Sequence, residues 1–77
     1  MRELLEYLVR SLVDDPTAVK VEEFEESDGA TTLELTVGDD DYGKVIGRGG
    51  RTAQALRTVV KAAAAKDDRR VFVDIVE

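Results

Sequence analysis

The stretch Lys44–Arg57 reads KVIGRGGRTAQALR and combines a glycine-rich turn with purely basic charge. It holds three of the chain's six glycines and four of its eleven Lys and Arg residues, and it has no acidic residue. Apolar positions on both sides of the turn recur at helical spacing, so the pattern predicts two helices joined by GRGG. Glycine permits the positive φ angles that such a sharp change of direction requires.

The first of these two helices is expected at about Asp41–Ile46, with Gly47 as its stop. The acidic run Asp39–Asp41 is interpreted as the cap of this short helix. The second helix is expected from about Arg51 to Lys66. Its predicted buried stripe consists of Ala53, Leu56, Val60 and Ala63.

Another helix is predicted before the turn, at residues 2–13, because its leucines and valines follow the spacing of one buried face. Asp14-Asp15-Pro16 ends it, since the residue before proline is disfavoured in a helix. Strands are expected at Val19–Glu26, Thr31–Val37 and Val71–Val76, the first two forming a hairpin. Phe24 breaks the alternation of the first strand, so either a bulge shifts its phase or Phe24 lies on the second face of the sheet.

This order, helix–strand–strand–helix–helix–strand, predicts an α+β fold in which one domain spans residues 1–77. The crossover through two helices places the last strand beside the second one, which gives a three-stranded mixed sheet. The helices are expected to cover one face of that sheet. The other face is expected to carry Phe24, Phe72, Val76 and the Thr and Glu positions of the hairpin.

Charge is strongly segregated along the chain, whose formal net charge is −6. Residues 1–41 hold thirteen acidic and three basic side chains, whereas residues 42–66 hold six basic and no acidic ones. A uniformly acidic surface would repel nucleic acid. A basic segment within it can attract phosphate locally while the remainder discourages non-specific binding.

Composition also argues against several classes of function. The chain has no Cys and no His, so two common catalytic groups and the usual transition-metal ligands are absent. We therefore expect a non-enzymatic protein with no cofactor, no metal and no small-molecule substrate. No apolar run has the length of a membrane span, and the N-terminus does not have the pattern of a signal peptide, so a cytoplasmic protein without membrane contact is expected.

The glycine turn itself is suited to an anion, because the helix that follows it begins with unpaired backbone N–H groups. Lys44, Arg48 and Arg51 surround the turn with positive charge. Two nucleotide-binding motifs fail here. The P-loop would need glycine at Val45 and lysine at Arg51, and the dinucleotide fingerprint would need glycine at Thr52 and a strand before the turn.

The segment VIGRGGRT resembles the core motif of the KH domain, an RNA-binding fold, with Gly47-Arg48-Gly49-Gly50 as its GxxG loop. The order of elements is similar to the type II, prokaryotic arrangement. The resemblance extends over the whole chain and is closest to small bacterial RNA-binding proteins with a single KH domain, of the KhpA type. YGKVIGRGGRTAQALRTVVKAAA and the closing VFVDIVE carry it.

The resemblance implies a groove for about four unpaired nucleotides, whose backbone the GxxG loop clamps. It implies that Arg48 and the amides of Gly49 and Gly50 contact phosphate. Flanking or lining roles fall to the other motif positions and to the loop on the opposite wall. These are Lys44 and Arg51 beside the phosphate, Val45 and Ile46 as an apolar surface toward the bases with one of the two facing the core, Thr52 after the turn, and Arg69 and Arg70 opposite.

The leading hypothesis is therefore a non-catalytic protein that binds single-stranded RNA and acts as an RNA chaperone or post-transcriptional regulator. The alternative is a protein-interaction module that pairs with itself or with a second KH-type RNA-binding protein, with RNA binding secondary. A homodimer contact is considered at Ala62–Ala65, because small side chains allow close packing of helices.

Overall fold

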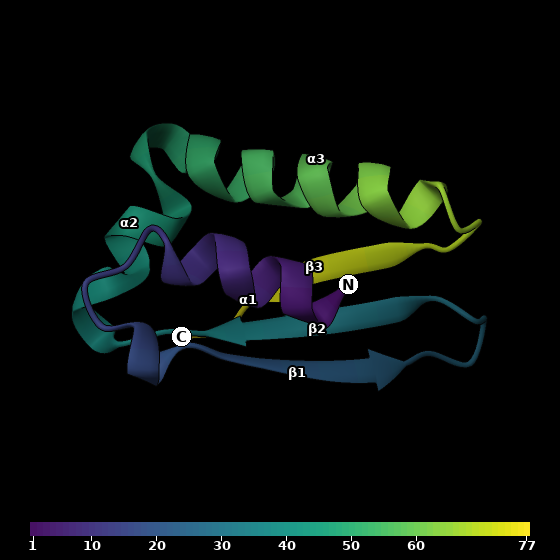
Figure 1. Cartoon of the computed structure of the whole chain (residues 1–77), viewed down its shortest axis with the longest axis horizontal. Coiled ribbons are helices and arrows are strands. Elements are labelled where there is room, and N and C mark those ends of the chain that lie inside the picture. Colours follow the sequence, from purple (N-terminus) through teal and green to yellow (C-terminus); the bar gives the residue numbers. More distant parts are fainter.

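The computed structural model describes all residues, 1–77, and confirms the predicted order of elements (Figure 1). Three short 3-10 turns, at Pro16–Ala18, Asp39–Asp41 and Arg48–Gly50, lie between the regular elements. None of the helices is long and apolar enough to cross a membrane. The helices and strands are α1 (Arg2–Arg10), β1 (Lys20–Glu25), β2 (Thr31–Thr36), α2 (Tyr42–Ile46), α3 (Arg51–Ala65) and β3 (Val71–Ile75).

The three strands form one mixed sheet in the order β1-β2-β3. β1 and β2 pair antiparallel as a hairpin, while β2 and β3 pair parallel because α2 and α3 form the crossover between them. α1 packs against β1 and α3 packs against β3. In Figure 1, α3 lies along the long axis of the molecule, with the glycine turn at one end and the loop to β3 at the other. The predicted α+β fold is thus confirmed.

The position of Phe24 is settled by the register of the hairpin. Pairing is continuous from Lys20 opposite Thr36 to Glu25 opposite Thr31, so β1 contains no bulge. Phe24 lies opposite Thr32, and Thr32 lies opposite Phe72 on the other neighbouring strand. Both phenylalanines are exposed, 42% and 44% respectively, so they belong to the face of the sheet that the helices leave open.

One apolar core holds the helices to the sheet, and its members come from α1, α2, α3 and all three strands. The buried stripe of α3 contains Ala64 in place of the predicted Ala63, which is only half-buried. The alanine run gave no means of choosing between these neighbours. The largest completely buried side chains of the core are Leu5, Val9, Leu33, Leu35, Val45 and Val60.

The first helix ends at Arg10, three residues before its predicted end. Beyond it the chain tightens into a turn, in which the Leu12 amide donates to the Val9 carbonyl at 2.9 Å. Leu12 is therefore 41% exposed and does not extend the buried face. The turn brings the backbone of Asp14 and Asp15 to a carboxylate that stands at the start of α2.

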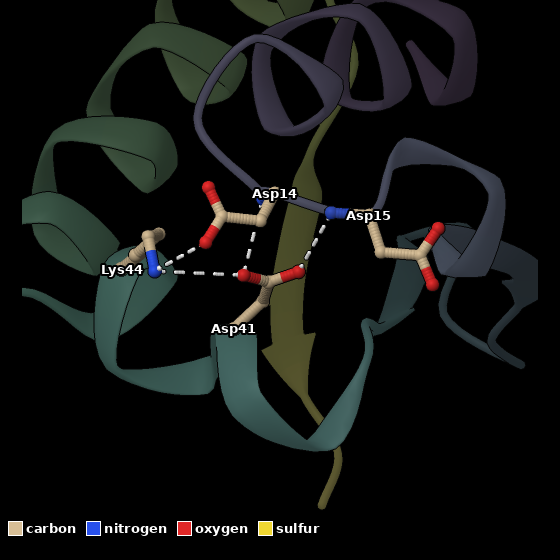
Figure 2. A network of polar contacts seen from close by, with 4 residues as sticks. All are labelled: Asp14, Asp15, Asp41 and Lys44. Atoms are coloured by element: carbon tan, nitrogen blue, oxygen red, sulfur yellow. Dashed lines mark hydrogen bonds and ion pairs between the residues drawn. The ribbon is translucent and has the colours of Figure 1, made fainter.

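That carboxylate belongs to Asp41, which is buried and joins two loops far apart in the sequence (Figure 2). It accepts the backbone N–H groups of Asp14 and Asp15, both at 3.1 Å, and its Oδ1 lies 3.7 Å from Lys44 Nζ. The prediction that the acidic run caps α2 was wrong, because no side chain of the run caps that helix. Asp41 instead fixes the α1–β1 connection against the start of α2.

The same contacts determine the protonation of Asp41. The hydrogen bond from the Asp14 amide, with that from Asp15 and the charge of Lys44, outweighs the opposite effect of burial and lowers the pKa of Asp41. Because the folded-state pKa lies below the ordinary value of 3.8, the carboxylate stabilises the fold fully above that pH. The contribution is lost as the pH falls through the folded-state pKa.

We expect Asp41→Asn to lower the urea midpoint of unfolding at pH 7, because an amide can accept only one of the two N–H groups and turns its own NH₂ toward the other. Asp39→Asn is the matched control, since Asp39 is exposed and undergoes the same change of charge. The gap between the two midpoints should begin to narrow as the pH falls below about 3.8, and it should close as folded wild-type Asp41 takes up a proton at its lower pKa. Equal midpoints for both variants at pH 7 would refute this role.

Candidate nucleic-acid interface

Gly47 sets the direction of the chain between α2 and α3. Its φ of 76° and ψ of 172° lie in a region that is essentially restricted to glycine. A Cβ at this position would lie 2.8 Å from both the amide nitrogen and the Cβ of Thr52, and closer still to Thr52 Oγ1. Positive φ and lack of space therefore both require glycine here. Thr52, a motif residue from the sequence, packs against the turn.

The next two glycines form the tip of the turn and leave it open, with Gly49 exposed and Gly50 half-buried. Gly49 and Gly50 have φ angles of 65° and 78°, and no heavy atom lies within 4 Å of where either Cβ would be. The Gly50 amide donates to the Gly47 carbonyl at 3.1 Å, whereas the amides of Arg48 and Gly49 take part in no loop hydrogen bond. Of the two amides that the resemblance assigns to phosphate, only that of Gly49 is thus unbonded.

Two cations flank this open backbone without competing partners. Arg48 and Arg51 are exposed, and neither forms an ion pair within the chain. Arg51 is the first residue of α3, whose first turn contains no acidic residue. Their charge adds to the partial positive charge of the helix N-terminus, so an anion at the tip would meet attraction from three sources.

Lys44 differs from the two arginines because it already has partners. Its Nζ lies 3.1 Å from an Asp14 carboxylate oxygen and 3.7 Å from Asp41 (Figure 2). The hydrogen bond and charge of Asp14 are the main causes that raise the pKa of Lys44. The structure therefore places this predicted site residue in the network that anchors α2.

The two apolar motif residues before the turn also differ from each other, in how deeply they are buried. Val45 is completely buried in the core, while Ile46 is half-buried. Only Ile46 can offer surface to a ligand beside the turn, and Val45 holds α2 in place beneath it. The residues that the structure gathers at this end of the molecule are thus Ile46, Arg48 to Arg51 and Thr52.

Arg69 and Arg70 belong to the loop between α3 and β3. Figure 1 shows that this loop lies at the end of α3 opposite to the glycine turn. The helix has 15 residues, which corresponds to about 22 Å between the two ends. Arg70 forms an ion pair with Asp28 in the β1–β2 turn at 3.2 Å and also donates to its carbonyl at 3.3 Å. The amide of Ala30 is the main cause that lowers the pKa of Asp28, and Arg70 adds to it.

Two contacts of α3 with β3 could not be predicted from the sequence patterns. Arg57 Nε donates to the Val73 carbonyl at 3.2 Å, and Lys61 Nζ lies 5.6 Å from the centre of the Phe72 ring. Strand alternation places Phe72 on the open face, and helical periodicity leaves Lys61 exposed. Their approach depends on how α3 lies over the edge strand, which neither pattern encodes.

A known protein family matches this chain over nearly its whole length. The family model described as "KhpA/KhpB, KH domain" matches residues 2–75. The chain belongs to the KhpA/KhpB KH-domain family. This match confirms the resemblance found in the sequence.

Three relatives in this KH family match over their full length. The RNA-binding protein KhpA of Clostridium perfringens is 53% identical over 78 residues, which cover 99% of this chain and 100% of the relative. The RNA-binding protein KhpA of Clostridium acetobutylicum is 50% identical with the same coverage. That of Halalkalibacterium halodurans is 49% identical over 77 residues, with both chains fully covered.

A solved structure of a longer protein contains the same fold. A crystal structure of Aquifex aeolicus Era aligns with a TM-score of 0.63 at 16% identity. The alignment covers 96% of this chain and 28% of the Era chain. At that identity, the likeness concerns the KH fold alone.

The backbone at Gly47 yields a test of the turn. Gly47→Ala should lower the free energy of unfolding by at least about 1–3 kcal/mol, because the residue would be strained and its Cβ would displace Thr52. Gly43→Ala is the control, since Gly43 lies inside α2 with nothing within 4 Å of its Cβ position. It should leave stability unchanged or raise it by up to about 1 kcal/mol. Chemical denaturation measures both, and equal effects would contradict this description of the turn.

Proposed function

We propose that this protein binds single-stranded RNA without catalysis and holds its backbone at the Gly47–Gly50 turn. The observation that carries the proposal is the open glycine tip, which has an unbonded amide at Gly49 and two unpaired arginines beside it. The names of its KhpA relatives support RNA as the ligand. A role as an RNA chaperone or post-transcriptional regulator in the cytoplasm accords with a non-catalytic grip on unpaired strands.

In this proposal each part of the turn has a separate task. Arg48 and Arg51 neutralise neighbouring phosphates, and the Gly49 amide donates to a phosphate oxygen. Ile46 offers apolar surface to a base. Lys44 contributes at longer range, because its ammonium group stays paired with Asp14. None of these contacts reads a base edge, so we expect loose sequence preference.

Arg48→Glu with Arg51→Glu should weaken binding of a fluorescent single-stranded RNA at least about tenfold, since a hydrogen bond to a charged group contributes about 1.5–3 kcal/mol. The slope of log affinity against log salt should flatten by about 0.7 for each phosphate that the variant no longer neutralises. Fluorescence anisotropy at several salt concentrations measures both quantities. Glycine is left in place, so that the backbone of the turn does not change.

Arg2→Glu with Arg10→Glu is the matched control, because it makes the same change of charge at two exposed arginines of α1. It should keep the affinity within a few-fold of wild type and keep the salt slope. If both double variants lose affinity equally, net charge rather than the glycine turn governs binding. If neither does, RNA is not held at this turn.

Pairing with a second copy is a further proposal, and one surface favours it. An apolar groove of about 320 Å³ lies between α1 and α3, and Leu12 and Val59 are 41% and 45% exposed there. The same patch on two copies can meet about a two-fold axis. This surface differs from the contact considered at Ala62–Ala65, where Ala64 is completely buried. The groove is lined by Leu8, Ser11, Leu12, Thr52, Ala55, Leu56 and Val59.

Light scattering at increasing protein concentration should show a rise from the mass of one chain toward that of two. Val59→Asp should abolish the rise, because the charge would lie in the apolar groove. Thr58→Asp is the control, since Thr58 is an exposed neighbour outside the groove. A wild-type protein that keeps the mass of one chain at every concentration would rule out self-pairing and leave the RNA proposal unaffected.

A further inference from the structure

A hollow of about 290 Å³ lies at the end of α3 that is remote from the glycine turn. The end of α3, the loop after it and the start of β3 enclose this hollow. Three of its five lining residues are cationic and one is aromatic. The lining consists of Lys61, Arg69, Arg70, Val71 and Phe72.

Phe72 presents an accessible ring to this hollow. It is 44% exposed, and β3 is an edge strand, so the ring can be reached from the side of α3. Lys61 Nζ lies 5.6 Å from the ring centre, a cation–π distance. An exposed aromatic ring beside cations is the combination that proteins use to stack a base and hold the phosphate next to it.

Two of the three cations have no carboxylate partner, and the third, Arg70, holds the loop that lines the hollow. Lys61 and Arg69 form no ion pair, whereas Arg70 is tied to Asp28 at 3.2 Å. The backbone of the loop is anchored as well: the Arg69 amide donates to the Ala64 carbonyl at 3.0 Å, and the Arg70 carbonyl accepts from Thr31 at 2.9 Å. The hollow is therefore held in shape before any ligand arrives, which lowers the cost of binding.

We propose that this hollow binds one base of the same single strand that the glycine turn holds, stacked on Phe72, with Lys61 and Arg69 at the adjoining phosphate. The proposal rests on the proposed RNA function and adds a second contact point to it. The volume is at the lower limit of small-molecule sites, which suits a single base. Lys61 would leave the ring for the phosphate, because base stacking outweighs a cation–π contact at an exposed site.

One RNA strand can span the distance between the glycine turn and the hollow. Lys61 is ten residues after Arg51 on α3, which corresponds to about 15 Å along the helix axis. The whole of α3 contains no acidic residue, so no carboxylate of that helix opposes a phosphate backbone there. Because a GxxG loop clamps about four nucleotides, the hollow would be reached only by a longer strand.

The test compares two single-stranded RNAs, one of about four nucleotides and one of about ten, by fluorescence anisotropy. Phe72→Leu keeps an apolar side chain but removes the ring. It should weaken binding of the longer RNA roughly tenfold and leave the shorter RNA unchanged. Phe24→Leu is the matched control, because Phe24 lies in the same cross-strand row with nearly the same exposure, and it should change neither affinity.

Equal affinity of wild type and Phe72→Leu for the longer RNA would refute base binding at the hollow. It would leave the proposed RNA contact at the glycine turn unaffected. An equal loss for both RNAs would also refute base binding at the hollow, since the ring would then act through the fold. If wild type binds neither RNA, both the clamp and the hollow are refuted.

A measurement on the unmodified protein does not depend on how the variant folds. Ultraviolet crosslinking of the longer RNA, carrying a photoreactive base at either end, should label the tryptic peptide 71–77, which is released by cleavage after Arg70. A label confined to peptides around the glycine turn contradicts the proposal.

Discussion

The geometry of this protein depends on the close contact between the backbone of Gly47 and Thr52. A side chain at Gly47 would occupy the place of Thr52, so this turn from α2 into α3 requires glycine at position 47. The turn directs α3 back over the sheet, and this makes the parallel pairing of β3 with β2 possible. It also leaves the tip open, with no heavy atom within 4 Å of where a Cβ of Gly49 or Gly50 would be. One steric requirement thus serves both the topology and the proposed binding surface.

Polar contacts of the fold sort its cations into two groups. Asp14 and Asp41 engage Lys44, and Asp28 engages Arg70, so these two cations hold connections in place. The cations at the turn and along α3 are left without carboxylate partners. The net charge of −6 therefore describes the molecule poorly, because the charge that a ligand meets depends on the side of the molecule it approaches.

Much of this fold could be predicted from the sequence, because burial leaves a period of about two in strands and 3.6 in helices. All six elements were found this way, and the whole glycine turn was identified from its residues. The role of Asp41 could not be found, since the two N–H groups that it accepts belong to the backbone 26 and 27 residues away. Likewise, a charge count could not show that Lys44 is paired while Arg48 is free, because pairing depends on distances between loops.

A turn with two free arginines can hold only a short piece of backbone, and its attraction falls as salt rises. Higher affinity requires contacts spread over a longer strand or over more than one copy of the protein. A second site on the same chain has an advantage here, because the nucleotides between the two sites act as the linker and α3 fixes the distance that they must span. The gain is largest when the length of the strand matches the length of the helix, and it disappears when the strand is too short to reach. A rigid α3 would in this way select for strand length although no contact at the turn reads a base.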